Sequence, residues 1–155
     1  MSRIDGSCWQ PDVTVATVVV RDGRLLMVEE YAGGDRLVLN QPAGHLEPDE
    51  SLAQAALRET REETGWDVEL TAFIGAYQWK VPDNGRHYLR FAFAAAPLRH
   101  DPGVRLDDGI ERAIWLTPDE LQAERARWRS PMVWQVASDF LAGRRYPLSL
   151  LQHVA

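Results

Sequence analysis

Short apolar runs separated by turn residues predict strands along most of the chain. The β-branched run at 13–20 predicts a buried strand, and Asp22-Gly23 predicts a tight turn leading into a hairpin partner at 25–28. A glycine-rich turn at 33–35 precedes a short strand at 37–39. Three more strands are predicted from similar apolar runs, near 73–79, at 87–96 and at 112–116.

Helical periodicity first appears after a loop rich in proline, glycine and acidic residues. Ser51 can cap a helix over 52–64, and Gln54 three positions later completes a capping box. Gly65 suits the left-handed position that ends such a helix. The segment therefore predicts a helix with both ends defined by sequence.

Two more helices are predicted near the C-terminus. The segment 117–120, Thr-Pro-Asp-Glu, is typical of a second capping box with proline in the first turn. Ser130-Pro131 begins a third helix, which Gly143 ends. Its core-facing stripe is predicted from helical spacing to contain Met132, Val133, Val136, Ala137, Phe140 and Leu141.

Strands and helices do not alternate regularly, so we expect an α+β protein with a mixed β-sheet sandwiched between helices (α/β/α). A chain of 155 residues is most simply one domain, 1–155, with a core over about 10–143 and a C-terminal tail at 144–155. No apolar run approaches the roughly 20 residues that cross a bilayer. The N-terminus lacks a signal-peptide pattern, so we expect a cytoplasmic protein.

The net charge of −6 argues against binding a nucleic-acid polymer, because phosphate backbones are held by basic surfaces. A small anionic substrate stays possible if a cation or local arginines neutralise it. The single cysteine, Cys8, excludes an internal disulfide framework and a cysteine-based zinc cluster. A monomer is preferred over a homodimer.

Three acids in the last turns of the first predicted helix raise a question of electrostatics. Glu59, Glu62 and Glu63 stand at i, i+3 and i+4, where like charges each cost about 0.2–0.5 kcal/mol. Arg58 can relieve Glu62, but no basic residue follows Glu63 at helical spacing. A solvated acidic face is one reading. The other is a site for a hard divalent cation such as Mg²⁺, which takes carboxylate oxygens and substrate phosphates as ligands.

The spacing upstream favours the second reading. The full pattern is Gly44-x5-Glu50-x7-Arg58-Glu59-Thr60-x-Glu62-Glu63-x-Gly65-Trp66. It resembles the Nudix box, the signature of hydrolases that act on nucleoside diphosphates linked to another group. All glycine, arginine and glutamate positions match, whereas Thr60 and Trp66 stand where bulky aliphatic residues are usual. These two departures concern local packing more than chemistry.

The resemblance implies the Nudix fold and a loop–helix–loop that binds Mg²⁺, with Mn²⁺ as a possible substitute. Glu59, Glu62 and Glu63 carry over as metal ligands, together with the backbone carbonyl of Gly44. Glu59 or Glu62 is the implied general base. The structural positions of the box carry over to Glu50, Arg58 and Gly65. A further acid from a later loop often completes such a site; Asp107, Asp108 and Glu111 are the candidates, and Glu111 is favoured.

Similarity beyond the box points to the NudJ-type phosphatases within this family. It involves the segments 13–16, 41–47, 78–79, 89–93, 129–131 and 145–148. It implies release of orthophosphate from nucleoside tri- and diphosphates, and from thiamine pyrophosphate or its hydroxymethylpyrimidine pyrophosphate precursor. The alternatives are a Nudix hydrolase that cuts a nucleotide sugar, a dinucleoside polyphosphate or an oxidised dNTP, and a non-catalytic ligand-sensing module. Ala43 stands where many relatives have glycine, and we expect its methyl group to narrow the space through which a substrate reaches the metal-bound phosphate position.

Several other residues are candidates for substrate binding. Trp79 and Tyr88 can stack on a flat base, or else pack against the sheet. Lys80, Arg24 and Arg90 can reach distal phosphates, or else be ordinary surface cations. His45 follows Gly44 and lies near any bound phosphate, or else shapes the loop.

Overall fold

The structure is a computed structural model that describes residues 8–155. The N-terminal segment 1–7, used above to argue against a signal peptide, lies outside these residues. The strands are β1 (Asp12–Arg21), β2 (Arg24–Tyr31), β3 (Leu37–Asn40), β4 (Ala43–His45), β5 (Trp66–Lys80), β6 (His87–His100) and β7 (Ile110–Leu116). The helices are α1 (Leu52–Thr64), α2 (Pro118–Ala123) and α3 (Met132–Leu141), with the short 3₁₀ turns η1 (Arg125–Arg127) and η2 (Leu148–Leu150).

The strands form one mixed sheet that opens into two halves. Its order is β3-β2-β1-β6-β5, with β4 beside β1 and β7 beside β2, and among these described strands only the β1–β6 pairing is parallel. β1 pairs with β2 only next to their turn, at Val20–Leu25 and Arg21–Arg24. Nearer the start of β1, at Thr14–Ala16, the antiparallel neighbour of β1 is β4 instead of β2. The β2–β3–β7 half therefore separates from the β4–β1–β6–β5 half, which leaves room between them.

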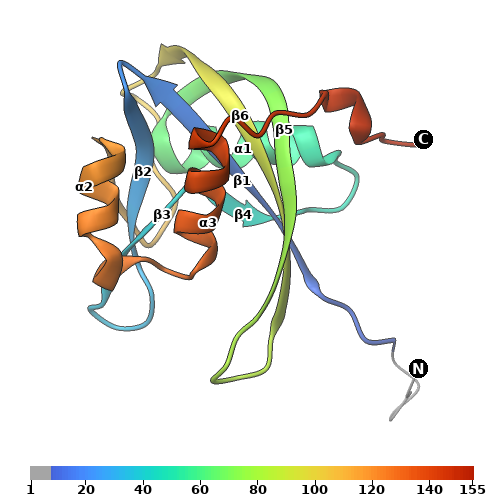
Figure 1. Ribbon diagram of the computed structural model, residues 1–155, viewed down its shortest axis with the longest axis horizontal. Coiled ribbons are helices and arrows are strands. Elements are labelled where there is room, and N and C mark those ends of the chain that lie inside the picture. The colour runs from blue at the N-terminus through green and yellow to red at the C-terminus, as the bar shows by residue number, and fades with distance from the viewer. Residues whose placement is uncertain (1–7) are drawn as a thin grey trace.

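Helices cover both faces of this sheet, as Figure 1 shows with α3 in front and α1 behind. Because side chains alternate along a strand, β1 serves two cores. Val15 packs with Ala55 and Ala56 of α1. Val18 packs on the other side with Val133 of α3. The expected α+β architecture, a mixed sheet between helices, is confirmed.

The ends of α1 follow the sequence signals. The Ser51 hydroxyl accepts from the Gln54 amide, and the Gln54 side chain accepts from the Ser51 amide, so the capping box is complete. Gly65 ends the helix at φ 74°, the left-handed conformation that glycine adopts without strain. The alanines at 55 and 56 face the sheet and are fully buried. The caps fix where the helix begins and ends, and the buried alanines fix its rotation and hence where its acids point.

Other details differ from the sequence prediction. Strand β5 begins at Trp66, directly after the helix cap, instead of near 73. The short strand β4 was not predicted. Thr117 caps α2, but the Glu120 carboxylate binds Arg24 instead of closing a capping box. Leu141, assigned to the buried stripe of α3, is 46% exposed because the helix ends there, past the edge of the core.

A buried acid joins the outer strands on the β2 side. Glu29 of β2 is 3% exposed, and its two carboxylate oxygens accept hydrogen bonds from Arg112 of β7 and Arg127 of η1. Burial alone would raise the pKa of Glu29, but the two arginines outweigh it and lower that pKa. Glu29 is therefore a charged link between three elements.

The segment after α3 lies along β5. Tyr146 and Phe73 exchange two backbone hydrogen bonds, of 2.9 and 2.8 Å. Leu151 then packs against the core on the α1 side. Within residues 8–155, no helix combines the length and the apolar character needed to span a bilayer.

Candidate active site

Gly44 lets the β4 backbone lie directly against the carboxylate of Glu59. A Cβ built on Gly44 would fall 2.1 Å from the Glu59 carboxyl carbon and within 2.4 Å of both its oxygens. A side chain at position 44 therefore has no room unless the Glu59 carboxylate moves. The glycine that opens the sequence motif and the first acid of its helix are therefore in direct contact, brought together because β4 pairs with β1 and α1 packs over both.

Arg58 organises the acids around it. Its guanidinium binds Glu50 through two parallel hydrogen bonds of 2.9 and 2.7 Å, and a third donor reaches the carbonyl oxygen of His45 at 3.0 Å. Another nitrogen donates to Glu59 at 2.8 Å and to Glu62 at 3.1 Å. Bidentate arginine–carboxylate pairs fix orientation as well as charge. Arg58 thus holds the loop against the helix and fixes the orientation of two of its acids.

Three carboxylates converge at the end of α1. One oxygen from each of Glu59, Glu62 and Asp107 lies within 4.8 Å of the others. Asp107 comes from the loop before β7, and its backbone N–H donates to the Glu62 carbonyl oxygen at 3.0 Å. This backbone contact fixes the loop beside the helix. The structure therefore brings Asp107 to the helix acids.

The other two loop acids point elsewhere. Glu111, which the sequence favoured as the additional ligand, accepts a hydrogen bond from the Tyr31 hydroxyl at 3.0 Å and is not in the cluster. Asp108 is fully solvated and lies 3.7 Å from Arg105. Sequence spacing alone could not choose among the three, because the choice depends on how the loop crosses the end of α1.

Glu63 lies deeper than its neighbours. It is 6% exposed and accepts a hydrogen bond of 2.8 Å from the Ala43 amide. Burial raises the pKa of Glu63 to about 9, and the nearby acids Glu30, Glu59 and Asp107 add to this effect. The pKa of Glu59 is raised too, mainly by burial and against the effect of Arg58. A cation bound here would therefore displace protons.

A cavity of about 420 Å³ begins at Gly44 and extends between the two halves of the sheet. Its walls come from the ends of β2 and β3 on one side, and from β4, β1, β6 and β5 on the other. Ser130 and Met132, before and in α3, also line it. Since Gly44 touches Glu59 and also lines the cavity, the cavity adjoins the acid cluster.

Four of the residues predicted to bind substrate line this cavity: His45, Trp79, Tyr88 and Arg90. Trp79 and Tyr88 stack on each other across β5 and β6, with ring centres 6.2 Å apart and planes at 22°. His45 is exposed, with its Nε2 3.2 Å from a carboxylate oxygen of Asp12. Arg90 is 6% exposed, so it is no ordinary surface cation.

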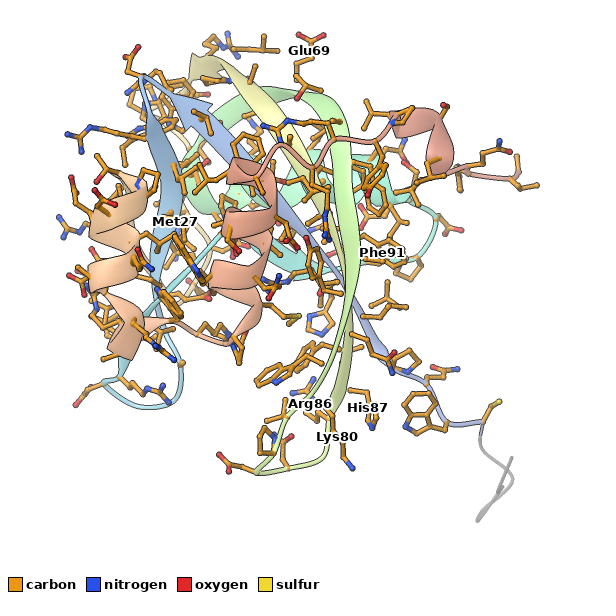
Figure 2. The ribbon with its side chains drawn as sticks, in the orientation of Figure 1. Met27, Glu69, Lys80, Arg86, His87 and Phe91 are labelled. Atoms are coloured by element: carbon orange, nitrogen blue, oxygen red, sulfur yellow. The ribbon has the colours of Figure 1, made fainter. Side chains whose placement is uncertain are left out.

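The other two predicted substrate residues lie outside the cavity lining. Arg24 forms an exposed ion pair with Glu120 of α2 at 3.2 Å. Lys80 is exposed at the end of the β5–β6 hairpin, where Figure 2 shows it near Arg86 and His87. The sequence could not predict that Arg90 lines the cavity and that Arg24 and Lys80 do not. A cation's position in the sequence does not show which side of the folded sheet its side chain occupies.

The lining contains residues that the sequence analysis did not select, among them Thr14, Glu30, Asn40 and Arg129. A signal for one of them was present. Thr14 is a hydroxyl residue in the predicted buried strand, and a buried polar side chain needs a partner. The others follow from the separation of β2 and β3 from β1, which no local pattern encodes.

The donor set suits a hard divalent cation. Carboxylate oxygens are the ligands that Mg²⁺ and Mn²⁺ prefer, and the repulsion within the cluster is relieved when such an ion binds. Beside it lies a cavity with aromatic and cationic walls, large enough for the rest of a small molecule. Fold and site together define an enzyme that hydrolyses a phosphorylated small molecule.

Comparisons with known proteins agree with this class. The model of the NUDIX domain matches residues 10–135. The chain belongs to the Nudix family and is a hydrolase that acts on phosphoanhydride bonds.

Among individual proteins, it is 41% identical over 143 residues to phosphatase NudJ of Escherichia coli K12, covering 92% of each chain. A solved NUDIX hydrolase from Nitrosomonas europaea is 47% identical, with a TM-score of 0.92 over 94% of this chain and 98% of that one. The E. coli ORF135 protein is 25% identical, with a TM-score of 0.69 over 87% and 91% of the chains.

Proposed function

We propose that the protein is a Mg²⁺-dependent phosphatase of small pyrophosphate compounds. It releases orthophosphate from nucleoside tri- and diphosphates, and from thiamine pyrophosphate or its hydroxymethylpyrimidine pyrophosphate precursor. The observation that carries the proposal is the cluster of Glu59, Glu62 and Asp107 beside a cavity. Similarity to a phosphatase over most of both chains supports release of the terminal phosphate.

In this proposal Glu59, Glu62, Glu63 and Asp107 hold the cation, with the Gly44 carbonyl as an additional ligand. When bound, the cation neutralises charge on the phosphate oxygens and helps to activate water. Mn²⁺ is expected to substitute for Mg²⁺, because it also prefers oxygen ligands.

Glu59 is the proposed general base, with Glu62 as the alternative. Burial raises the pKa of Glu59, which makes its carboxylate a stronger proton acceptor. Arg58 donates to the same carboxylate and fixes its direction. In-line attack of water on the terminal phosphorus then depends on positioning and charge more than on covalent chemistry.

Phosphate release from a nucleoside triphosphate, measured with and without Mg²⁺, tests the proposal. Glu59→Gln and Glu63→Gln should each lower kcat by about 10²–10⁴ while the fold survives. Glu69→Gln is the matched control, because Glu69 is an exposed acid of β5 outside the cluster. The proposal fails if both variants retain wild-type rates on every substrate, or if turnover needs no divalent cation.

Product analysis tests which bond is cut. Orthophosphate and a nucleoside diphosphate support the proposal. Pyrophosphate and a nucleoside monophosphate would mean that the enzyme cuts an inner bond of the polyphosphate. That result would favour the alternative of a Nudix hydrolase of another specificity.

A further inference from the structure

Two residues that pair across β1 and β6 at the cavity each have a buried polar atom without a partner among the described residues. Thr14 of β1 and Arg90 of β6 face each other in the parallel β1–β6 pairing, and both line the cavity. The Thr14 hydroxyl and the Arg90 Nε are buried and form no hydrogen bond within residues 8–155. Buried polar atoms are nearly always satisfied, so two adjacent exceptions at one cavity indicate a missing partner.

The direction of Arg90 follows from the strand. Its neighbour Phe91, labelled in Figure 2, packs into the core on the α1 side. Successive side chains alternate across a sheet, so Arg90 points to the opposite face, where the cavity lies. On that face the apolar core stops at Ala92, and the polar floor formed by Arg90 and Thr14 begins.

Arg90 is also poorly paired as a cation. Its terminal nitrogen NH1 contacts the side-chain oxygens of Asn40 and Gln41 at 3.4 Å each, the long end of the hydrogen-bond range. The acid on the facing wall, Glu30, is bound by Arg129 at 3.2 Å and by the Asn40 amide at 3.1 Å. Burial lowers the pKa of Arg90 to about 10. A desolvated guanidinium with weak partners costs stability, and a bound acceptor would recover it.

We propose that Arg90 and Thr14 form a recognition subsite for the edge of an amino-bearing heteroaromatic ring, carried by the organic group that is attached to the polyphosphate. Arg90 Nε donates to a ring nitrogen or carbonyl oxygen, and the Thr14 hydroxyl makes the adjacent hydrogen bond. The inference rests on the proposed function, because it assumes that the polyphosphate occupies the Gly44 end of the same cavity.

A ring edge fits this subsite better than a phosphate does. The side-chain oxygens of Asn40 and Glu30, which line the cavity, can accept hydrogen bonds from an exocyclic amino group, but they would repel a phosphate dianion. The stacked pair Trp79–Tyr88 on the neighbouring wall offers aromatic surface of the kind that contacts flat rings. A cytosine or adenine nucleotide and an aminopyrimidine pyrophosphate share this pattern of acceptor and amino donor.

The test compares substrates with and without a ring. Steady-state constants are measured for cytidine triphosphate, thiamine pyrophosphate and inorganic tripolyphosphate, with wild type, Arg90→Met and Thr14→Val. Thr17→Val is the matched control, since Thr17 is a buried threonine of the same strand that does not line the cavity. Thr14→Val keeps the side-chain shape and removes a hydroxyl that has no partner within residues 8–155, so it should fold normally even if Arg90→Met does not.

We expect Arg90→Met to raise KM about 10- to 100-fold for the ring-bearing substrate that wild type prefers, with kcat largely retained. Thr14→Val should raise the same KM by a smaller factor. Hydrolysis of tripolyphosphate should be unaffected by either change. Thr17→Val loses only a long hydrogen bond of 3.5 Å to the Ala56 carbonyl oxygen, so it should leave all these kinetic constants unchanged. Whether wild type prefers cytidine triphosphate or thiamine pyrophosphate shows whether the ring that binds is that of a nucleotide or of a thiamine-type compound.

Equal losses on tripolyphosphate would overturn the inference, since Arg90 would then bind phosphate or support the fold. Unchanged constants on both ring substrates would overturn it too, as would a wild type that prefers tripolyphosphate to both. If wild type hydrolyses none of the three, the proposed function fails instead. Binding of cytidine triphosphate, followed by tryptophan fluorescence because Trp79 lines the cavity, then decides whether Arg90→Met weakens ring binding.

Discussion

The contact between Gly44 and Glu59 allows a test of the site by a single methyl group. Gly44→Ala places a carbon 2.1 Å from the Glu59 carboxyl carbon, and ordinary contact begins near 3.4 Å. The carboxylate must therefore move by about 1.3 Å. Gly44 has no left-handed φ, so alanine meets no backbone strain and the effect comes from this clash alone.

Such a displacement is large on the scale of the chemistry. Mg²⁺ requires oxygens near 2.0–2.1 Å in near-ideal geometry, and a misplacement of about 1 Å costs about 10²-fold in rate. We expect Gly44→Ala to lower kcat/KM for phosphate release by at least about that factor. Overpacking at a tight contact should also destabilise the metal-free protein by about 1–3 kcal/mol, measured by urea unfolding.

The stability loss has an internal control. In a Glu59→Ala background the clashing carboxylate is absent, so adding Gly44→Ala should cost little, and the two substitutions should be non-additive. Gly103→Ala is the external control, because its Cβ would meet only the half-buried Asp101 side chain at 3.2 Å, away from the acid cluster. Wild-type turnover by Gly44→Ala, with the same stability cost in both backgrounds, would refute the reasoning.

Three further outcomes are expected. Asp107→Asn should weaken Mn²⁺ binding at least about tenfold by calorimetry, whereas Glu111→Gln should not; the reverse result would restore the ligand that the sequence favoured. Arg58→Lys keeps the charge but loses the two-pronged contact with Glu50, and should lower the free energy of unfolding by about 1.5–3 kcal/mol; an unchanged urea midpoint would contradict this. Glu29 has a pKa below its ordinary 4.5, so its stabilisation is complete above that pH and disappears as the pH falls through the lowered pKa. Glu29→Gln should therefore be less stable than wild type at pH 7, and the gap in urea-unfolding free energy should close below pH 4.5; a gap independent of pH would count against the ion pairs.

The parts of the fold and site that sequence could predict are those encoded locally. The caps at Ser51 and Gly65 fix helix α1 at both ends, and the spacing of Glu59, Glu62 and Glu63 follows from helical geometry. A capping residue and a helical repeat act over a few positions, so they can be read without the rest of the chain. The α+β class follows in the same way from the order of elements.

The choice among the loop acids, and which residues become neighbours, depend on contacts between distant segments, which sequence could not predict. Asp107 joins the acids because its amide reaches the carbonyl of Glu62, a contact that composition does not encode. Thr14 and Arg90 become neighbours only because β1 and β6 pair in parallel. The end of α3 illustrates the same limit, since Leu141 continues the helical stripe but extends past the core that would cover it.

Gly44 separates two tasks that the enzyme performs in adjoining spaces. On one side Gly44 lies against the carboxylate of Glu59, the proposed general base, where an added methyl group would displace it. The ring subsite proposed around Arg90 is built from other residues, on β1 and β6. Substitutions in that subsite would then change which ring is recognised while the acids of α1 keep their positions.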